Sequence, residues 1–427
     1  MGLDRDHYFS IRVTRFFLRL TGFWIVESKR DEMVIDFALI YTRVAVLLAA
    51  VILSLDLYHL SEDLYDMVFT ICNLMTVLTV VFKLLIMTWH RNSVANLISF
   101  SLNEFWHKDY KSTEMDILKN CERQCIVLIL AFIMSACGTG CSYMMRPIIE
   151  NIGKNETDRI HPIKVWLDLP LATTPYFEIM YFVEILITTQ VAICFFCFDI
   201  FLCVLNIHVS GQLEILQSRL ECIYDENRIE SPKMYSDEKL KNLEKSSIAY
   251  NKLCNCIKYH EMVIWYVQQI ERIFTIIILG QMLTSSLLTC LVGFQLLSGI
   301  VEITKRYIFI AYMCGCIVQL ITYTFTCNEI TVASLQLADV AFHADWYVTP
   351  YDKGGRSIRH GIKFLVQRTQ RPLCLTAGGF FPVSLDSFTK VIILENIMIA
   401  ILSLLGNQYS NVLFYYTARK RNPCCLI

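Results

Sequence analysis

Seven long apolar runs constrain this chain more than any other feature of its sequence. They lie at residues 37–57, 64–88, 125–146, 177–207, 272–297, 305–326 and 384–406. Crossing about 30 Å of hydrocarbon takes roughly 20 helical residues. A helix is suited to lipid because it satisfies its own backbone hydrogen bonds. The sequence therefore predicts an all-α membrane protein with seven transmembrane helices.

The distribution of basic residues predicts how these helices are oriented. The segment 1–36 has no apolar run of the roughly 7–15 residues that a signal peptide needs, so we expect it to remain in the cytosol. In that orientation the cytosolic segments hold 25 Lys and Arg and the extracellular segments hold 8, which agrees with the excess of positive charge found inside. Asn155, which begins the one Asn-x-Ser/Thr sequon of the chain, is then extracellular and is a candidate glycosylation site.

The polar segments predict further helices outside the membrane. Apolar residues recur at helical spacing in the loop 211–269, so the fourth and fifth spans are expected to continue into the cytosol. Residues 14–27 predict a short amphipathic helix, which either lies on the membrane surface or packs against the bundle. Residues 327–383 form a second cytosolic segment, in which Trp346 and Tyr347 are expected to bury against neighbouring helices. Residues 407–427 form a C-terminal tail.

Several function classes are excluded by what the sequence lacks. A net charge of -1 and scattered basic residues argue against a nucleic-acid partner. Neither a Gly-x-Ser-x-Gly nor a His-Glu-x-x-His motif occurs, and no glycine-rich phosphate loop does, so we expect no enzyme and no cofactor. Cys254, Cys256 and His260 lack a second ligand pair, so no metal is expected there.

Four stretches resemble one known family. They are LRLTGFW at 18–24, PYFEIM at 175–180, AFHADWY at 341–347 and GIKFLVQRTQRPLCLTAGGFFPVSLDSFTKV at 361–391. All four resemble the insect odorant receptors, seven-helix proteins whose final helix lines a tetrameric cation channel. The resemblance implies a subunit of a non-selective cation channel gated by a small volatile or semi-volatile organic ligand. It also implies a tuned subunit that assembles with the family's shared co-receptor as a heterotetramer in the plasma membrane of olfactory sensory neurons.

The resemblance further implies roles for particular parts of the chain. It makes the region 211–269 part of an intracellular anchor domain and places the odorant in the outer half of the bundle, between the second, third, fourth and sixth helices. Taken alone, each candidate there is better explained by helix packing; Glu184 is the sharpest, since a carboxylate inside a span needs water, a partner or a ligand. The candidates are Phe69, Cys72, Asn73, Thr76, Ser135, Gly138, Ser142, Met180, Tyr181, Glu184, Thr188, Tyr312 and Cys316.

For the pore, the resemblance points to Ile401, Leu404 and Leu405, which share one face of the seventh helix, the segment 384–406. The sequence departs from the family pattern after Val391, so contact with lipid or a neighbouring helix is the alternative for these three. The last four residues, 424–427, look like a prenylation box. That interpretation conflicts with an extracellular C-terminus.

Two other receptor classes compete with this interpretation. A gustatory receptor of the same superfamily is disfavoured by the matches at 341–347 and 361–391. A G-protein-coupled receptor would place its N-terminus outside, which would put the basic segments on the wrong face of the membrane. The third span also lacks an Asp/Glu-Arg-Tyr ending and the seventh lacks Asn-Pro-x-x-Tyr.

Overall fold

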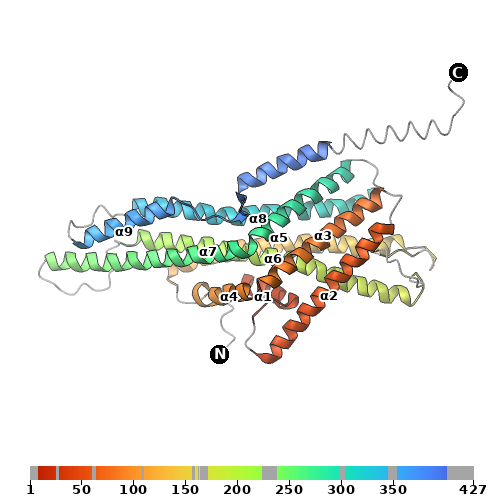
Figure 1. Ribbon diagram of the computed structural model, residues 1–427, viewed down its shortest axis with the longest axis horizontal. Helices are drawn as coiled ribbons and strands as arrows, with labels where there is room; N and C mark the ends of the chain where they lie inside the picture. Colours follow the sequence, from red (N-terminus) through yellow and green to blue (C-terminus); the bar gives the residue numbers. More distant parts are fainter. Residues whose placement is uncertain are drawn as a thin grey trace, which may run out of the picture.

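The computed structural model is an elongated bundle of helices (Figure 1). It describes residues 8–25, 28–59, 64–106, 110–155, 159–161, 163, 172–223, 238–297, 303–344 and 353–401. The helices are α1 (Phe9–Thr21), α2 (Lys29–His59), α3 (Leu64–Trp89), α4 (Arg91–Phe100), the π-helical turn η1 (Ser101–Phe105), α5 (Ser112–Glu150), α6 (Tyr176–Glu221), α7 (Glu238–Leu297), α8 (Ile303–His343) and α9 (Lys353–Thr369). A further helix covers residues 385–401.

Six helices in the described part of the chain are long and apolar enough to cross a membrane: α2, α3, α5, α6, α7 and α8. They contain six of the seven predicted spans, with α8 reaching from before residue 305 to well beyond 326. The helix over 385–401 occupies most of the predicted seventh span, whose last residues lie outside the described ranges. Apolar run length alone was thus enough to locate these helices.

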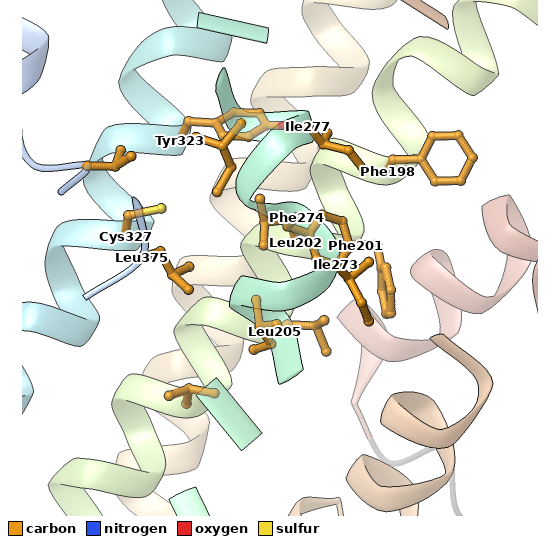
Figure 2. Close-up of a cluster of buried hydrophobic side chains, with 14 of the residues drawn as sticks. Phe198, Phe201, Leu202, Leu205, Ile273, Phe274, Ile277, Tyr323, Cys327 and Leu375 are labelled. Atoms are coloured by element: carbon orange, nitrogen blue, oxygen red, sulfur yellow. The ribbon is translucent and has the colours of Figure 1, made fainter. Parts of the chain in front are cut away.

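Helix α6 lies at the centre of the bundle, where it contacts α1, α2, α3, α5, α7 and α8. Figure 2 shows the packed core around α6. Four α6 side chains, Phe198, Phe201, Leu202 and Leu205, belong to one apolar cluster with side chains of α7, of α8 and of the segment just before residue 376. The side chains that they meet are Ile273, Phe274, Ile277, Tyr323, Cys327 and Leu375. Because such a core is densely packed, it holds the three longest helices in a fixed relationship.

Helices α6, α7 and α8 all run past the predicted spans. Helix α6 continues to Glu221, and α7 begins at Glu238, so the predicted helical continuations of the fourth and fifth spans are present on both sides of the region 224–237. Helix α9 packs on the extensions of α7 and α8 (Figure 1). Trp346 and Tyr347, expected to pack in this region, lie outside the described residues.

The N-terminal helix α1 differs from its predicted range of 14–27. It ends at Thr21 because Gly22 adopts a left-handed conformation, with a φ of 86°, and the Phe23 N–H bonds the Leu18 carbonyl at 2.8 Å. A Cβ at Gly22 would lie 2.5 Å from the Leu39 Cβ, so a larger residue does not fit. The helix packs on α6, α2 and α5, as the bundle-packing alternative expects, while Phe9, Phe16 and Leu20 stay exposed on its other face.

A two-residue hairpin precedes the final helix. Strands β1 (Thr376–Ala377) and β2 (Phe381–Pro382) pair antiparallel, and Gly378 and Gly379 between them adopt φ of 62° and 76°. The Gly378 N–H bonds the Thr275 carbonyl of α7 at 2.9 Å, and the Thr376 N–H bonds the Glu271 carboxylate at 3.0 Å. The hairpin therefore ties the start of the final helix to α7.

Candidate functional site

A cavity lies inside the bundle between α2, α3, α5, α6, α7 and α8. Its volume is about 130 Å³, and its walls are mostly apolar. We call it the inner chamber. Five residues that the sequence singled out line it: Asn73, Thr76, Thr188, Tyr312 and Cys316. Three different helices, α3, α6 and α8, bring these side chains to one place.

A smaller cavity of about 30 Å³ adjoins the inner chamber. Leu53, Asn73, Tyr143 and Ile163 line both cavities, so they form the junction. The smaller cavity is also lined by Phe69, Asp56, Asp66, Thr70, Arg146, Ile160 and His161. We call it the outer chamber, because Asp56 and Asp66 lie near the ends of α2 and α3 that the predicted topology places outside. A polar outer chamber thus opens toward an apolar inner one.

Two polar groups in the inner chamber have no hydrogen-bond partner among the described residues. The Tyr312 hydroxyl donates to Asn73 Oδ1, which leaves Asn73 Nδ2 without an acceptor. The Thr188 hydroxyl, on the α6 wall, is the second such group. Two other chamber hydroxyls bond to their own helices, Thr76 to the Cys72 carbonyl and Thr139 to the Ser135 carbonyl, both at 2.9 Å. Buried polar groups are usually paired, so these two are candidates for contact with a ligand.

The remaining predicted contacts lie outside the inner chamber. Cys72 is buried next to Asn73 on α3, and Ser135 lies near Gly315 on α8. Gly138 is exposed on α5, and the Ser142 hydroxyl bonds the Gly138 carbonyl at 2.7 Å. Met180 is half-buried on α6 and does not line either chamber, and the Tyr181 hydroxyl donates to the Met144 carbonyl at 2.9 Å.

On α5 the predicted ligand contacts and the residues that line the inner chamber lie on different faces of the helix. The chamber is lined by Ala136, Thr139, Gly140 and Tyr143, whereas the predicted face carried 135, 138 and 142. Each residue advances a helix by about 100°, so an error of one position moves a side chain from the chamber to another surface. Tyr143 could have indicated the chamber-lining face from the sequence, because a buried tyrosine in a span usually has a partner for its hydroxyl.

Glu184 is 1% exposed, and it pairs with a histidine. Its carboxylate lies 3.5 Å from His161 Nδ1, and the His161 ring packs on Phe177 with centroids 4.6 Å apart. Glu184 lines neither chamber, but His161 lines the outer one. The partner that a carboxylate inside a span requires is therefore within the chain.

The floor of the inner chamber rests on a buried charge pair that the sequence reasoning missed. Gln319 lines the chamber and donates to the Asp199 carboxylate, whose other oxygen lies 2.6 Å from Lys83 Nζ. The Tyr323 hydroxyl also donates to Asp199, at 2.5 Å. The signal was present in the sequence, since Lys83 and Asp199 are opposite charges inside two predicted spans.

An apolar groove lies on the other side of the α5 and α6 wall. It encloses about 430 Å³ and shares Ala136, Gly140, Thr188, Ala192 and Phe196 with the inner chamber. Its remaining lining is almost wholly apolar and includes Phe132 and Met144. Only one layer of side chains therefore separates the chamber from this groove.

One of the three predicted pore residues lies on the described part of the final helix. Ile401 is 46% exposed, and Leu404 and Leu405 lie outside the described residues. Glu395 is the buried exception on this helix, and its carboxylate accepts a hydrogen bond from the Ser286 hydroxyl of α7 at 3.0 Å. Asn155 is exposed, whereas the other two residues of its sequon lie outside the described ranges.

Comparison with known proteins places this arrangement in a family. The family described as 7tm Odorant receptor matches residues 63–394. Odorant receptor 13a of Drosophila melanogaster is 22% identical over 403 residues, which cover 90% of this chain and 92% of the relative. Odorant receptor Or2 of Anopheles gambiae is 21% identical over 239 residues, which cover 56% of this chain and 58% of that receptor.

The fold agrees with a solved olfactory receptor. The structure of the insect olfactory receptor OR5 from Machilis hrabei in complex with eugenol superimposes with a TM-score of 0.76 at 16% identity, covering 94% of this chain and all of that chain. A second structure of OR5 from Machilis hrabei gives a TM-score of 0.74, covering 92% of this chain and 97% of that chain. Because the family match spans most of the sequence and the fold agrees over nearly all of it, this protein is a multi-pass membrane protein of the insect odorant receptor family.

Proposed function

We propose that this chain is the odorant-binding subunit of a ligand-gated, non-selective cation channel, in which the inner chamber holds the odorant. The observation that carries the proposal is the chamber itself. It lies inside the bundle, is mostly apolar, and has two buried polar groups without a partner among the described residues. Pockets for small organic ligands have this composition, with a few polar groups that fix orientation.

The proposed pore runs along the final helix, residues 384–406. Its described part exposes Leu394, Met398 and Ile401 at helical spacing, while Glu395 faces α7. Apolar side chains on that exposed face meet lipid or the same helix of other subunits. If this face lines a pore, an apolar constriction that closes by dewetting would be formed by Ile401, Leu404 and Leu405.

Helix α7 provides the proposed path between chamber and pore. Leu288 of α7 lines the chamber, and Ser286 of the same helix donates to Glu395. A Cβ at Gly293, further along α7, would lie 2.6 Å from the Ile399 side chain, so the two helices are in close contact. A ligand that shifts α7 would therefore move the final helix directly.

The proposed assembly is a heterotetramer with the family's shared co-receptor, in the plasma membrane of olfactory sensory neurons. The extensions of α6, α7 and α8, together with α9, form a packed helical region beyond the predicted spans. We assign this region to the anchor domain through which subunits associate, with the N-terminus in the cytosol and Asn155 outside. The proposed partners are thus a co-receptor, a small odorant and lipid.

The decisive experiment is to record odorant-evoked current in cells that express the chain with and without the co-receptor. We expect a current through monovalent and divalent cations only when both chains are present. Surface labelling of an N-terminal epitope before and after permeabilisation gives the orientation. A current that requires a G protein, or an epitope exposed on intact cells, contradicts the proposal.

A further inference from the structure

We propose that Asn73 reads a hydrogen-bond acceptor on the odorant, so that this receptor selects neutral molecules with an acceptor at one end of a compact apolar body. Ketones, aldehydes and esters are the ligand class. This inference rests on the inner chamber being the odorant site, as proposed above. It adds the chemistry that the site recognises and the residue that recognises it.

Asn73 lies where the two chambers meet. Its side chain is 7% exposed and lies on α3 at the junction of the polar outer chamber and the apolar inner chamber. An amide there can meet a ligand whose polar end points outward and whose apolar body points inward. Chamber geometry thus fixes which end of the ligand Asn73 contacts.

The hydrogen bonds of Asn73 leave its NH₂ group available to a ligand. The Tyr312 hydroxyl donates to Asn73 Oδ1, so the amide is held with its NH₂ group free. Asn73 Nδ2 has no acceptor among the described residues, although the atom is buried. A buried donor without an acceptor is costly, and a ligand that supplies one regains that hydrogen bond. A ligand that carries an acceptor is therefore expected to bind here more tightly than one without.

The rest of the chamber defines the apolar body. Val77, Val191, Phe195 and Leu288 form its walls, and no charged side chain lines it in the described part of the chain. A charge placed inside this chamber would lose its hydration without a counter-ion, so a neutral body is favoured there. The chamber's 130 Å³ is close to the roughly 150 Å³ of an apolar cavity that holds benzene, which indicates a ring-sized body.

The test uses matched odorants on cells that express the full chain with its co-receptor. Each ketone or ester of about ring size is paired with the hydrocarbon of the same shape, and alcohols, amines and acids complete the panel. Wild type is expected to respond to the acceptors at lower concentration than to the matched hydrocarbons. A receptor that responds equally to both, or only to amines or acids, overturns the inference.

Asn73→Leu keeps the volume and removes the amide. We expect the half-maximal concentration for ketones to rise about tenfold, the loss of one hydrogen bond, while that for hydrocarbons stays the same or falls. Ser142→Ala is the control, because Ser142 lines neither chamber and its hydroxyl bonds the Gly138 carbonyl at 2.7 Å, so both half-maximal concentrations should stay unchanged. An equal shift for ketones and hydrocarbons in Asn73→Leu would mean that Asn73 only supports packing.

Tyr312→Phe gives an independent readout if Asn73→Leu does not reach the surface. Without the Tyr312 hydroxyl, the Asn73 amide can turn and present Oδ1, so alcohols should gain potency relative to ketones. An unchanged ratio of alcohol to ketone potency overturns the inference. A complete absence of odorant current at normal surface expression is a different result, which overturns the proposed function and this inference with it.

Discussion

Lys83 Nζ of α3 lies 2.6 Å from Asp199 Oδ1 of α6, and both side chains are fully buried. Lys83 also donates to the Phe195 carbonyl at 3.1 Å, and Asp199 accepts from Tyr323 and Gln319 of α8. Gln281 of α7 donates to Gln319 at 2.7 Å, so four helices meet in one polar network. The network lies directly under the inner chamber, because Gln319 belongs to both.

Breaking this pair from one side should destabilise the receptor. Lys83→Met leaves the Asp199 charge without its cation, and Asp199→Leu leaves Lys83 without its anion. The loss of one member of a buried pair typically costs about 3–5 kcal/mol, so we expect strongly reduced surface expression and a lower Tm for each single variant. Surface biotinylation and thermal unfolding of purified protein measure these effects.

The double variant K83M/D199L is the matched control. It removes both charges together and fills the space with apolar atoms, a change that is often neutral or stabilising. We expect it to recover much of the expression lost in the single variants. Single variants with wild-type expression would show that the pair contributes nothing to folding.

The face of α5 that lines the chamber can be tested with two glycines. Gly140 lines the chamber, Gly138 is exposed, and a Cβ at either position would meet nothing within 4 Å. Leucine should be tolerated at both positions, and glycine to leucine also favours the helix by up to about 1 kcal/mol. We expect Gly140→Leu to raise the half-maximal concentration of bulky odorants severalfold, while Gly138→Leu has no effect. The reverse outcome in dose-response currents would restore the face predicted from the sequence.

A charged contact outside the predicted spans gives a pH-dependent prediction. Arg219 Nε donates to Glu114 Oε1 at 2.8 Å, and the guanidinium lies 4.7 Å from the centre of the Tyr259 ring. Burial raises the pKa of Glu114, but the hydrogen bonds from Arg219 and from the Lys111 N–H outweigh it and lower the pKa below its usual value. The pair therefore stabilises fully above the unfolded-state pKa, about 4.3, and this contribution is lost as the pH falls through the folded-state pKa.

Glu114→Gln should accordingly lower the Tm at pH 7, with a loss of about 1.5–3 kcal/mol for a hydrogen bond to a charged group. The difference in Tm between variant and wild type should shrink as the pH approaches the folded-state pKa. Arg219→Lys keeps the positive charge but loses the planar guanidinium. We expect this variant to retain only part of the stability that the wild-type pair provides. A constant difference in Tm from pH 7 to pH 3 would rule out this linkage.

The proposed gate predicts a gain of current without ligand. Ile401 is exposed on the final helix, where a polar side chain would keep water in a closed apolar constriction. Ile401→Ser in the complex should therefore raise the ligand-independent current. Met398→Ser, one turn earlier on the exposed surface, tests how far the constriction extends.

Cysteine scanning of the same positions gives the control. Ile401, Leu404 and Leu405 are each replaced by cysteine and treated with a water-soluble thiol reagent during recording. Block at one or more of the three positions supports a pore face. Normal odorant responses that the reagent leaves unchanged at all three would place this face against lipid or another helix.

The sequence by itself determined the six long apolar helices in the described part of this protein. Apolar runs are long and continuous because lipid allows no exposed backbone, so the helices α2, α3, α5, α6, α7 and α8 follow from length and hydropathy. The family followed from short stretches of sequence, and the family match agrees.

Only the tertiary structure decided which side chains meet. Asn73, Thr188 and Tyr312 were named from composition and resemblance, but their arrangement around one chamber depends on how α3, α6 and α8 are rotated. Inside a membrane nearly every face of a helix is apolar, so hydropathy does not mark the inward face as it does in a soluble protein. The Lys83–Asp199 pair could not be predicted either. These two charges are 116 positions apart in the sequence, and only the packing of the helices brings them together.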